Sequence, residues 1–405
     1  MSRWIHRMLR PSKSAQWRLE CLGHSLLELA AAALPGSLVF RLGEWLGILA
    51  WHILPQRRRI VLKNLRVAYC GELELPAIEQ LARQSFRRSG ANLVSTAHTA
   101  RLKPTQLHKI LHIENRELLE EKLATGRGVV LLLAHMGNWE LLSRIIHLFP
   151  AGAKCGAFYR PLNNLLLDQR VLTRRQADGT RMFSKRDPFH QVTKFLRDGG
   201  IVGILSDQRV GRQGEVVPFF GRQTRATPLP SLLARRAKAE ILALSLVTVA
   251  PGKWKAVFYP VEPDVTTHHC MAALEKAMRS SPADVFWLQD RWKVYAGNRM
   301  PLRKWLDHAE QRSNKPHRAL IWNTNAADAW QIPNDWIHPD VDYERLDEAS
   351  TRAAAAASSP AELAELLTSI DHQQVKPLDF ILAPSSDRVL RRAAKQVAIP
   401  LIPLS

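Results

Sequence analysis

One segment of the chain restricts its fold more than any other: a continuous apolar run, Val129–Ala134, after which the pattern changes. The length and the β-branched content of this run are those of a strand buried in a sheet. Beyond Gly137, apolar residues recur at helical spacing over Leu141–Phe149, and Asn138 stands where a helix N-cap belongs. A strand followed by a helix is typical of α/β proteins, which place their chemistry at the carboxyl ends of the strands.

A histidine and a carboxylate lie at this turn. His135 directly follows the apolar run, and Glu140 falls in the first turn of the expected helix. In a continuous helix, residues five apart are separated by about 140°, but a turn can bring them together. We therefore predict that the Glu140 carboxylate bonds one imidazole nitrogen and that the other nitrogen acts as a base. Free helix N–H groups at Asn138 would favour negative charge beside that base.

The spacing of this pair does not distinguish it by itself. Two histidines have an acid five residues further on, His135 and His112, which is about what random order would produce in a chain with 15 histidines and 37 acids. His112 lies in a charged stretch with no apolar strand before it. A lone histidine is more often structural, so it is the strand-end position that favours a catalytic role for His135.

The charge of the chain is unevenly distributed. The 405 residues carry a net charge of +20, yet residues 310–405 hold 10 basic and 13 acidic residues, so the excess lies wholly in residues 1–309. Such an excess implies an anionic partner, for which nucleic acid, acidic lipid headgroups and an acidic protein all qualify, although any one arginine pair can simply face water. With 46% hydrophobic and 23% charged residues, the composition excludes a disordered chain and a polytopic membrane protein.

The N-terminal segment 1–60 holds the most apolar stretch of the chain, residues 22–55. Charged residues and Pro35 interrupt it, so no window of 18 uncharged residues exists there and a conventional spanning helix is not expected. Aromatic and aliphatic side chains followed by the basic run Arg57–Arg59 favour helices that lie on an anionic leaflet. The alternative is a pair of buried core helices.

The chain offers little for covalent or metal chemistry. The cysteines are widely spaced, which predicts neither a disulfide framework nor a metal site and indicates a reducing compartment. No G-x-S-x-G elbow is present, so an acyl-enzyme has no support in the sequence. No cofactor is expected. The four cysteines are Cys21, Cys70, Cys155 and Cys270.

Several segments, taken in order, resemble the lysophospholipid acyltransferase superfamily, in particular the bacterial late acyltransferases of lipid A biosynthesis. The resemblance spans residues 20–305 and departs from the family at Leu229-Pro230, where a glycine is usual, and at Gln289 to Lys293, where W-x-H-x-R is common. The segments that carry it are Asn64 in RIVLKNLRVAY, His135 to Glu140, Tyr159 to Asn164, Arg174 and Gly179, Ser206 to Gln208, Phe219 to Thr227, and Trp287 to Lys293.

This resemblance implies an α/β fold with a central mixed sheet flanked by helices over residues 61–309. It implies that His135 deprotonates an acceptor hydroxyl as the hydroxyl attacks an acyl thioester, and that Glu140 stabilises the imidazolium. The donor would be acyl carrier protein or acyl-CoA, and the acceptor a hydroxyl of a lipid A precursor or a related phosphorylated glycolipid. The expected location is the cytoplasmic face of the inner membrane.

A further group of residues is expected to contact substrate. Arg160, after an apolar-aromatic segment, suits phosphate recognition, although a surface arginine is the alternative. Phe219 and Phe220 would wall an acyl slot or belong to the core, and Asp207 would contact substrate or cap a helix. The predicted substrate-binding residues are Asn138, Arg160, Asp207, Gln208, Phe219, Phe220, Gly221 and Arg291.

Other functions stay open at this point. The same residues could serve a lysophospholipid acyltransferase acting on a glycerophospholipid, or a hydrolase that uses water. From another class, the basic part could bind nucleic acid. Nucleic-acid binders interleave basic and exposed aromatic residues, whereas the N-terminal tryptophans here cluster in apolar segments, so no nucleic acid is expected.

Residues 310–405 lie outside the resemblance. Short strands are expected at 318–322, 378–382 and 399–404, a helix at 388–398, and a break at the Ala/Ser-rich Thr351–Ser359. This rhythm predicts a small Rossmann-like accessory domain, faintly similar to the first half of a sugar-nucleotide glycosyltransferase. No Gly-rich phosphate loop is present.

Overall fold

The computed structural model describes residues 13–150, 152–184, 186–211, 213–293, 306, 313–323, 331–383 and 388–403. The chain forms two compact units. The first comprises residues 1–53, 84–207 and 228–286, and the second residues 54–83, 208–227 and 287–405. Each unit therefore combines segments that are far apart in the sequence. The domain boundaries predicted after residues 60 and 309 stay predictions.

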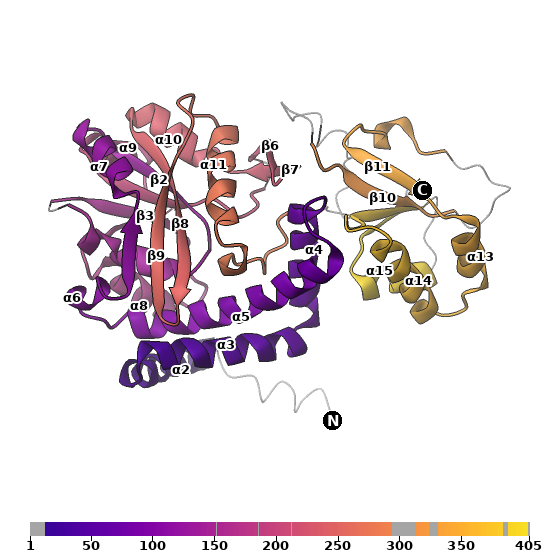
Figure 1. Cartoon of the computed structure of the whole chain (residues 1–405), viewed down its shortest axis with the longest axis horizontal. Helices are drawn as coiled ribbons and strands as arrows, with labels where there is room; N and C mark the ends of the chain where they lie inside the picture. Colours follow the sequence, from indigo (N-terminus) through magenta and orange to yellow (C-terminus); the bar gives the residue numbers. More distant parts are fainter. Residues whose placement is uncertain are drawn as a thin grey trace. The chain divides into compact units, whose positions relative to one another are not determined.

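The first unit is built on a seven-stranded mixed sheet, which confirms the predicted fold class (Figure 1). All neighbouring strands run parallel except β8 and β9, which pair antiparallel. β2 is central, between β8 and β5. In spatial order the strands are β1 (Leu111–Glu114), β9 (Lys253–Pro260), β8 (Glu240–Ala250), β2 (Val129–Leu133), β5 (Ile201–Leu205), β3 (Cys155–Tyr159) and β4 (Arg181–Ser184).

Helices cover both faces of β2, which explains why its sequence is apolar at every position. Val129, Leu131 and Leu133 join a core cluster with side chains of the 3₁₀ helix η1. α10 and α11 pack against β2 as well, and α9 packs on α10. The helices between the strands are α6 (Pro104–Leu107), α7 (Arg116–Ala124), η1 (Trp139–Leu148), α8 (Leu165–Gln176), α9 (Phe189–Arg197), α10 (Leu229–Ala237), α11 (Thr267–Arg279) and η2 (Pro282–Asp284).

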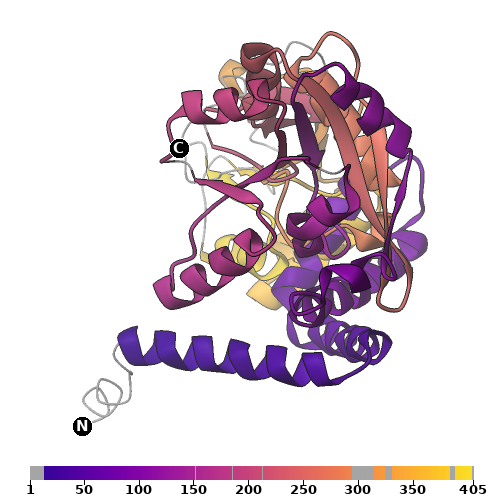
Figure 2. The ribbon, with the colours of Figure 1, turned by 90° about the vertical axis from the view of Figure 1, so that its left-hand side faces the viewer.

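Two helices, α2 (Lys13–Ala33) and α3 (Gly36–Ile53), form the N-terminal part of the first unit, and Pro35 stands at the break between them. Figure 2 shows α2, in indigo, as a long straight helix. α3 packs tightly on α5 (Leu75–Thr99), because a Cβ added at Gly47 would lie 2.3 Å from the Phe86 carbonyl oxygen. α3 thus has a close-packed side, as the core-helix alternative required.

The opposite sides of α2 and α3 are apolar and exposed. Trp45 is 72% exposed, and it is accompanied on α3 by Leu38, Leu42, Leu46 and Leu49. Within the described residues, no single helix is long and apolar enough to cross a membrane; only α3 taken together with α4 meets that test, and this pair is sharply bent.

The second unit contains a parallel four-stranded sheet in the order β11-β10-β12-β13, a separate two-stranded hairpin, and helix α4. The strands and helix predicted at 318–322, 378–382, 388–398 and 399–404 are confirmed in β10, β12, α15 and β13. The elements are α4 (Pro55–Tyr69), β6 (Glu215–Phe219), β7 (Arg222–Ala226), β10 (His317–Ile321), η3 (Asn334–Trp336), β11 (Val341–Arg345), α13 (Glu348–Ala356), α14 (Pro360–His372), β12 (Phe380–Ala383), α15 (Arg388–Val397) and β13 (Leu401–Pro403).

The break predicted at Thr351–Ser359 is wrong, since α13 occupies most of that segment. Alanine has the highest helix propensity of all residues, so an alanine run favours a helix once a start signal precedes it. Asp347 supplies that signal as the N-cap, where its side chain accepts a hydrogen bond from the Ser350 N–H at 2.7 Å.

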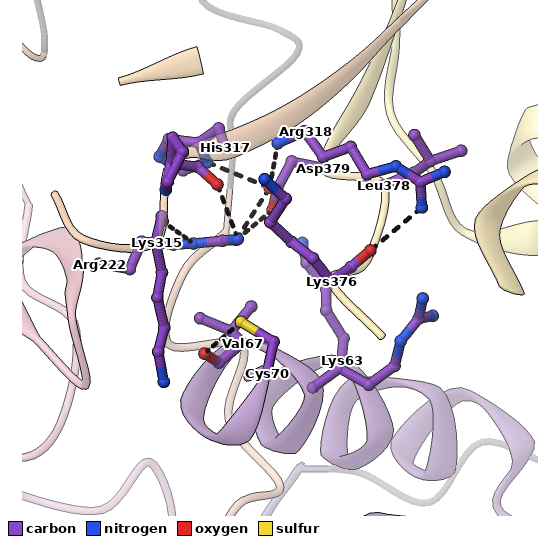
Figure 3. Close-up of polar contacts among 12 residues, drawn as sticks. Lys63, Val67, Cys70, Arg222, Lys315, His317, Arg318, Lys376, Leu378 and Asp379 are labelled. Atoms are coloured by element: carbon purple, nitrogen blue, oxygen red, sulfur yellow. Dashed lines mark hydrogen bonds and ion pairs between the residues drawn. The ribbon is translucent and has the colours of Figure 1, made fainter. Parts of the chain in front are cut away.

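A buried ion pair joins the β6–β7 hairpin to the parallel sheet of the second unit (Figure 3). Arg222 of β7 donates from Nη1 to both carboxylate oxygens of Asp379, at 2.9 and 2.8 Å, and both side chains are fully buried. In the same unit Arg66 of α4 binds Asp371 and donates to the Val375 carbonyl at 2.8 Å. The parallel sheet and the region around α14 are therefore packed with α4 and the hairpin.

Candidate active site

The turn after β2 places His135 at the carboxyl edge of the seven-stranded sheet. The His135 carbonyl accepts from the Phe286 N–H at 2.8 Å, which fixes the backbone of the turn. Gly137 has φ +56, and a Cβ there would lie 2.2 Å from the Leu246 carbonyl oxygen. Only glycine combines that backbone conformation with so close an approach. The His135 side chain is 15% exposed, so it is enclosed but reachable.

The carboxylate that holds the imidazole belongs to Asp207. Its Oδ1 lies 2.7 Å from His135 Nδ1, and its Oδ2 accepts from the His135 backbone N–H at 3.1 Å. Asp207 comes just after β5, which pairs with β2 in parallel register, so the carboxyl ends of the two strands meet. Asp207 therefore lies at the same edge of the sheet as His135. Its hydrogen bond to the imidazole was not predicted.

This contact determines the charge state of the imidazole. Burial lowers the pKa of His135, but the charge and hydrogen bond of Asp207, together with the charge of Glu140, outweigh it, so the pKa lies above the ordinary 6.5. A carboxylate at Nδ1 favours the tautomer with its proton on Nδ1 and leaves Nε2 as the basic nitrogen. The pair is thus suited to general-base chemistry.

Glu140 lies in the first turn of η1 and binds a different partner from the one predicted. Its carboxylate accepts from Arg175 Nε at 2.9 Å and from Nη2 at 2.6 Å, which is a bidentate ion pair with α8. The hydrogen bond predicted from Glu140 to the imidazole is therefore made by Asp207, while Glu140 still acts on the pKa of His135 through its charge. Its catalytic role stays a prediction.

Two site residues escaped the sequence reasoning. The sequence analysis singled out Arg174, which binds Glu28 of α2, whereas its neighbour Arg175 binds Glu140. Trp139 lies edge-on to the His135 ring at a centroid distance of 5.3 Å. The position of Arg175 between the family-like residues Arg174 and Gly179 could have pointed to it.

Asn138 and Arg160 stand where the pattern placed them, with different surroundings. Asn138 precedes η1 but makes no side-chain cap; it is fully buried and donates to Thr99 Oγ1 at 3.0 Å. Arg160 is exposed and directly follows β3, so it lies at the carboxyl edge of the same sheet. Contact of either residue with substrate stays a prediction.

The other predicted residues belong to the second unit, where Gln208 begins the segment that carries the hairpin. Phe220 and Gly221 link β6 to β7 with φ values of +52 and +77, the signature of a two-residue type I′ turn. Phe219 and Phe220 are each 1% exposed and pack on each other and on Trp292. Here the core alternative describes both phenylalanines, and an acyl slot beside them stays a prediction.

Arg291 points into the second unit. Its Nη1 donates to Thr224 Oγ1 at 2.7 Å and to the Arg225 carbonyl at 3.0 Å, and its guanidinium lies over the Phe219 ring. Asn64 of α4 donates to the Trp287 carbonyl at 2.8 Å. These family-like positions thus join the 287–291 segment to α4 and to the hairpin, and contact of Arg291 with substrate stays a prediction.

In the described part of the chain no cluster of three His, Cys, Asp or Glu side chains could hold a metal ion.

The match to known proteins covers the family-like segments described above. Residues 15–294 match the model of the bacterial lipid A biosynthesis acyltransferase family. The chain is 26% identical over 270 residues to lipid A biosynthesis palmitoleoyltransferase of Escherichia coli, covering 64% of this chain and 87% of the relative. It is 25% identical over 297 residues to the lauroyltransferase of the same organism, covering 71% and 94%. Phosphatidylinositol mannoside acyltransferase of Mycobacterium tuberculosis is 29% identical over 189 residues, covering 43% and 57%.

Proposed function

Because the chain belongs to the bacterial lipid A biosynthesis acyltransferase family, we propose that it moves a fatty acyl chain from an acyl thioester to a hydroxyl of a lipid A precursor or a related phosphorylated glycolipid. That it is an acyl-transferring enzyme acting on a glycolipid follows from the family and its relatives. The observation that carries the mechanism is the His135–Asp207 pair at the carboxyl edge of the sheet.

The reaction needs one base that later acts as an acid. Nε2 of His135 takes the proton of the acceptor hydroxyl while its oxygen bonds to the thioester carbonyl carbon. The tetrahedral intermediate then expels the thiolate, which takes the proton back from the imidazolium and leaves as a thiol. Asp207 holds the ring and stabilises the imidazolium. The acyl chain passes directly between the substrates, and no covalent acyl-enzyme forms.

The Glu140–Arg175 pair would act through charge. Glu140 adds a second negative charge near the imidazolium and helps to raise the pKa of His135. The Arg175 side chain is 25% exposed and is held bidentately, so its guanidinium is fixed where it can stabilise a developing oxyanion or a substrate phosphate. Arg160, exposed at the same edge, is the second candidate for phosphate.

The exposed apolar sides of α2 and α3 support attachment to the inner membrane at its cytoplasmic face. Trp45 and its leucine neighbours would enter the interface, and the exposed Arg57 and Arg59 would contact anionic headgroups. Replacing Trp45 and Leu49 by serine should release the enzyme from anionic vesicles in a co-sedimentation assay. Leu93→Ser is the control, because Leu93 is an exposed leucine of α5, outside the apolar sides of α2 and α3. Equal retention of wild type and the double variant would contradict the attachment.

The test of the mechanism is transfer of a labelled acyl chain from acyl carrier protein to a lipid A precursor. His135→Ala should lower transfer by roughly 10²–10⁴-fold, the usual contribution of general acid–base catalysis. His112→Ala is the matched control, because His112 has the same spacing to an acid but is not at the carboxyl end of β2. Undiminished transfer by the His135 variant would overturn the mechanism.

The same assay separates the alternatives. Release of free fatty acid without any acceptor would indicate a hydrolase. Transfer to a lysophospholipid in preference to the phosphorylated glycolipid would indicate the other acceptor class. Arg160→Ala should slow transfer to a phosphorylated acceptor more than transfer to its dephosphorylated analogue; equal loss on both would remove Arg160 from phosphate recognition.

A further inference from the structure

A groove lies on the first unit between α9 and α10, and none of the residues predicted to contact substrate lines it. Its volume is about 580 Å³, and the two helices pack side by side (Figure 1). The residues that line it are Phe189, His190, Thr193, Arg197, Leu232 and Arg236. None of these residues is part of the mechanism described above.

The floor of this groove is apolar and open to solvent. Phe189 is 44% exposed and Leu232 is 36% exposed, although both helices bury other apolar side chains in the core. Large apolar side chains on two adjacent helices form a continuous patch when they line one groove. Such a patch rimmed by polar groups is typical of a protein interaction site.

The rim of the groove is basic. Arg197 and Arg236 line the groove and are exposed, and exposed Arg235 adjoins Arg236 on α10. Arg197 donates to the Arg236 carbonyl at 2.8 Å, which holds it against the other helix. The nearby acids already have cationic partners: Asp198 pairs with Lys194, and Glu240 pairs with Lys122 and Arg127. Among the described residues, neither Arg235 nor Arg236 forms an ion pair with an acid.

The groove begins at the edge of the sheet that carries His135. α9 lies between β4 and β5, and α10 precedes β8; all three strands run parallel to β2. Both helices therefore run against the strands, with their N-termini at the carboxyl edge. Phe189, the first residue of α9, marks this end, while Arg197 and Arg236 lie at the far end.

We propose that this groove docks an acidic helix of the carrier protein that brings the acyl thioester. The inference rests on the proposed function, because it names the surface used by that donor. An apolar side chain of the helix would lie on Phe189 and Leu232, and flanking carboxylates would meet the rim arginines. A docked carrier would then deliver its flexible acyl arm to the edge of the sheet where His135 lies.

The chemistry of the groove favours a protein over a small polyanion. Phe189 and Leu232 give the groove an apolar floor beside its arginines, whereas a site for a small polyanion is built from charged and polar donors. Charge on such a rim mainly accelerates encounter and fixes the orientation of a partner, so its effect should weaken as salt screens it.

The experiment compares two donors of the same acyl chain, one on acyl carrier protein and one on pantetheine. Arg235→Glu/Arg236→Glu should lower kcat/KM with the carrier-bound donor about tenfold or more, mainly through KM, and the loss should shrink at high salt. Transfer from acyl-pantetheine should change less than about twofold, because that donor has no protein to dock. The control Lys109→Glu/Lys253→Glu makes the same charge change at two exposed lysines elsewhere on the first unit. It should leave kcat/KM unchanged with both donors.

Two further variants keep the inference testable if the glutamates disturb α10. Arg235→Gln/Arg236→Gln should reproduce a weaker loss with the carrier donor only, and Phe189→Ser/Leu232→Ser should do the same without changing charge. Equal loss with both donors, or no loss with the carrier, would overturn the docking surface. Wild-type enzyme that transfers from neither donor would instead refute the proposed function.

Discussion

Two histidine–aspartate pairs among the described residues, one in each unit, have histidine pKa values shifted in opposite directions. In the first unit Asp207 lies 2.7 Å from His135 Nδ1, and the pKa of His135 is raised. In the second unit Asp379 lies 3.4 Å from His317 Nδ1, yet the pKa of His317 is lowered. The residue types are the same, so their surroundings make the difference.

The difference lies in what else the carboxylate holds. Asp379 accepts from Arg222 with both oxygens (Figure 3), and burial of His317 is complete. Burial alone would raise the pKa of Asp379, but the Arg222 guanidinium and His317 hold it well below its usual range. Burial is the largest influence on the pKa of His317, and Arg222 and Lys63 lower it further.

A histidine–aspartate contact therefore indicates a base only where the carboxylate has no cation of its own. At the sheet edge, Asp207 directs its charge to the imidazole, and a side chain that is 15% exposed remains in reach of substrate. In the second unit the same charge is neutralised by an arginine inside the protein. The first arrangement serves proton transfer, and the second joins the hairpin to the sheet.

The largest expected effect comes from Asp207→Asn. A neutral amide cannot stabilise the imidazolium, so kcat should fall by roughly 10²–10⁴-fold. Because Asp207 raises the pKa of His135, its removal should also move the acidic limb of the kcat/KM profile to lower pH. Transfer measured from pH 5 to 9 tests both effects, with Asp198→Asn, an exposed carboxylate, as the control. An unchanged acidic limb would contradict the assignment.

Arg222→Met should destabilise the second unit by about 3–5 kcal/mol, because it leaves the Asp379 carboxylate buried without its cation. Arg222→Met/Asp379→Leu should recover most of that loss, since it removes both charges together. Urea unfolding measures the free energy of each variant. Lys194→Ala/Asp198→Ala, which removes an exposed pair of the same kind, should cost less than about 1 kcal/mol. If Arg222→Met lowers the free energy of unfolding no more than this control does, the Arg222–Asp379 pair is not buried.

The parts of this architecture that the sequence could predict are those specified locally. The apolar run of β2 and the helical period after Gly137 gave the strand, the turn and the position of His135. Alternation of short apolar segments in the same way identified β10, β12 and α15. β11, with exposed and half-buried residues, has no such signal and was not predicted.

The side-chain partners of His135 and Glu140 could not be predicted from local sequence patterns. Asp207 is 72 residues from His135, and the contact exists because β5 pairs with β2, a neighbour relation that no local pattern specifies. Glu140 was preferred as the partner because it is close in sequence, whereas the turn directs it to Arg175 on α8. The Arg222–Asp379 ion pair of the second unit likewise joins residues 157 positions apart.

The two histidines should respond to pH with opposite signs. The pKa of His317 in the folded state lies below its ordinary 6.5, so the unfolded chain binds the proton first and stability falls as the pH drops below about 6.5. The pKa of His135 lies above 6.5, so its contribution is fully present below that value and is lost as the pH rises through the folded pKa.

Unfolding free energies at pH 5.5 and 7.5 test this contrast. His317→Gln should reduce the loss of stability at the lower pH, and His135→Gln should reduce the relative gain there. His112→Gln, at an exposed histidine in β1, is the control. If the His317 and His135 variants change the pH dependence of stability in the same direction, the opposite pKa shifts of the two histidines are wrong.

The smallest expected change in acyl transfer is that of Cys155→Ala. This variant tests whether the reaction needs any nucleophile besides the acceptor hydroxyl. Cys155 begins β3 in the same sheet as His135, and burial raises the pKa of its thiol to about 12, so the thiolate that could attack a thioester does not form near neutral pH. Acyl transfer by the variant should stay within about twofold of wild type, because a base that activates the acceptor directly leaves no step for a thiol. Steady-state transfer, with a search for an acyl-cysteine by mass spectrometry after rapid quenching, measures this. Loss of transfer together with a trapped acyl-cysteine in the wild type would replace the direct route with a two-step one, in which the His135–Asp207 pair activates a thiol.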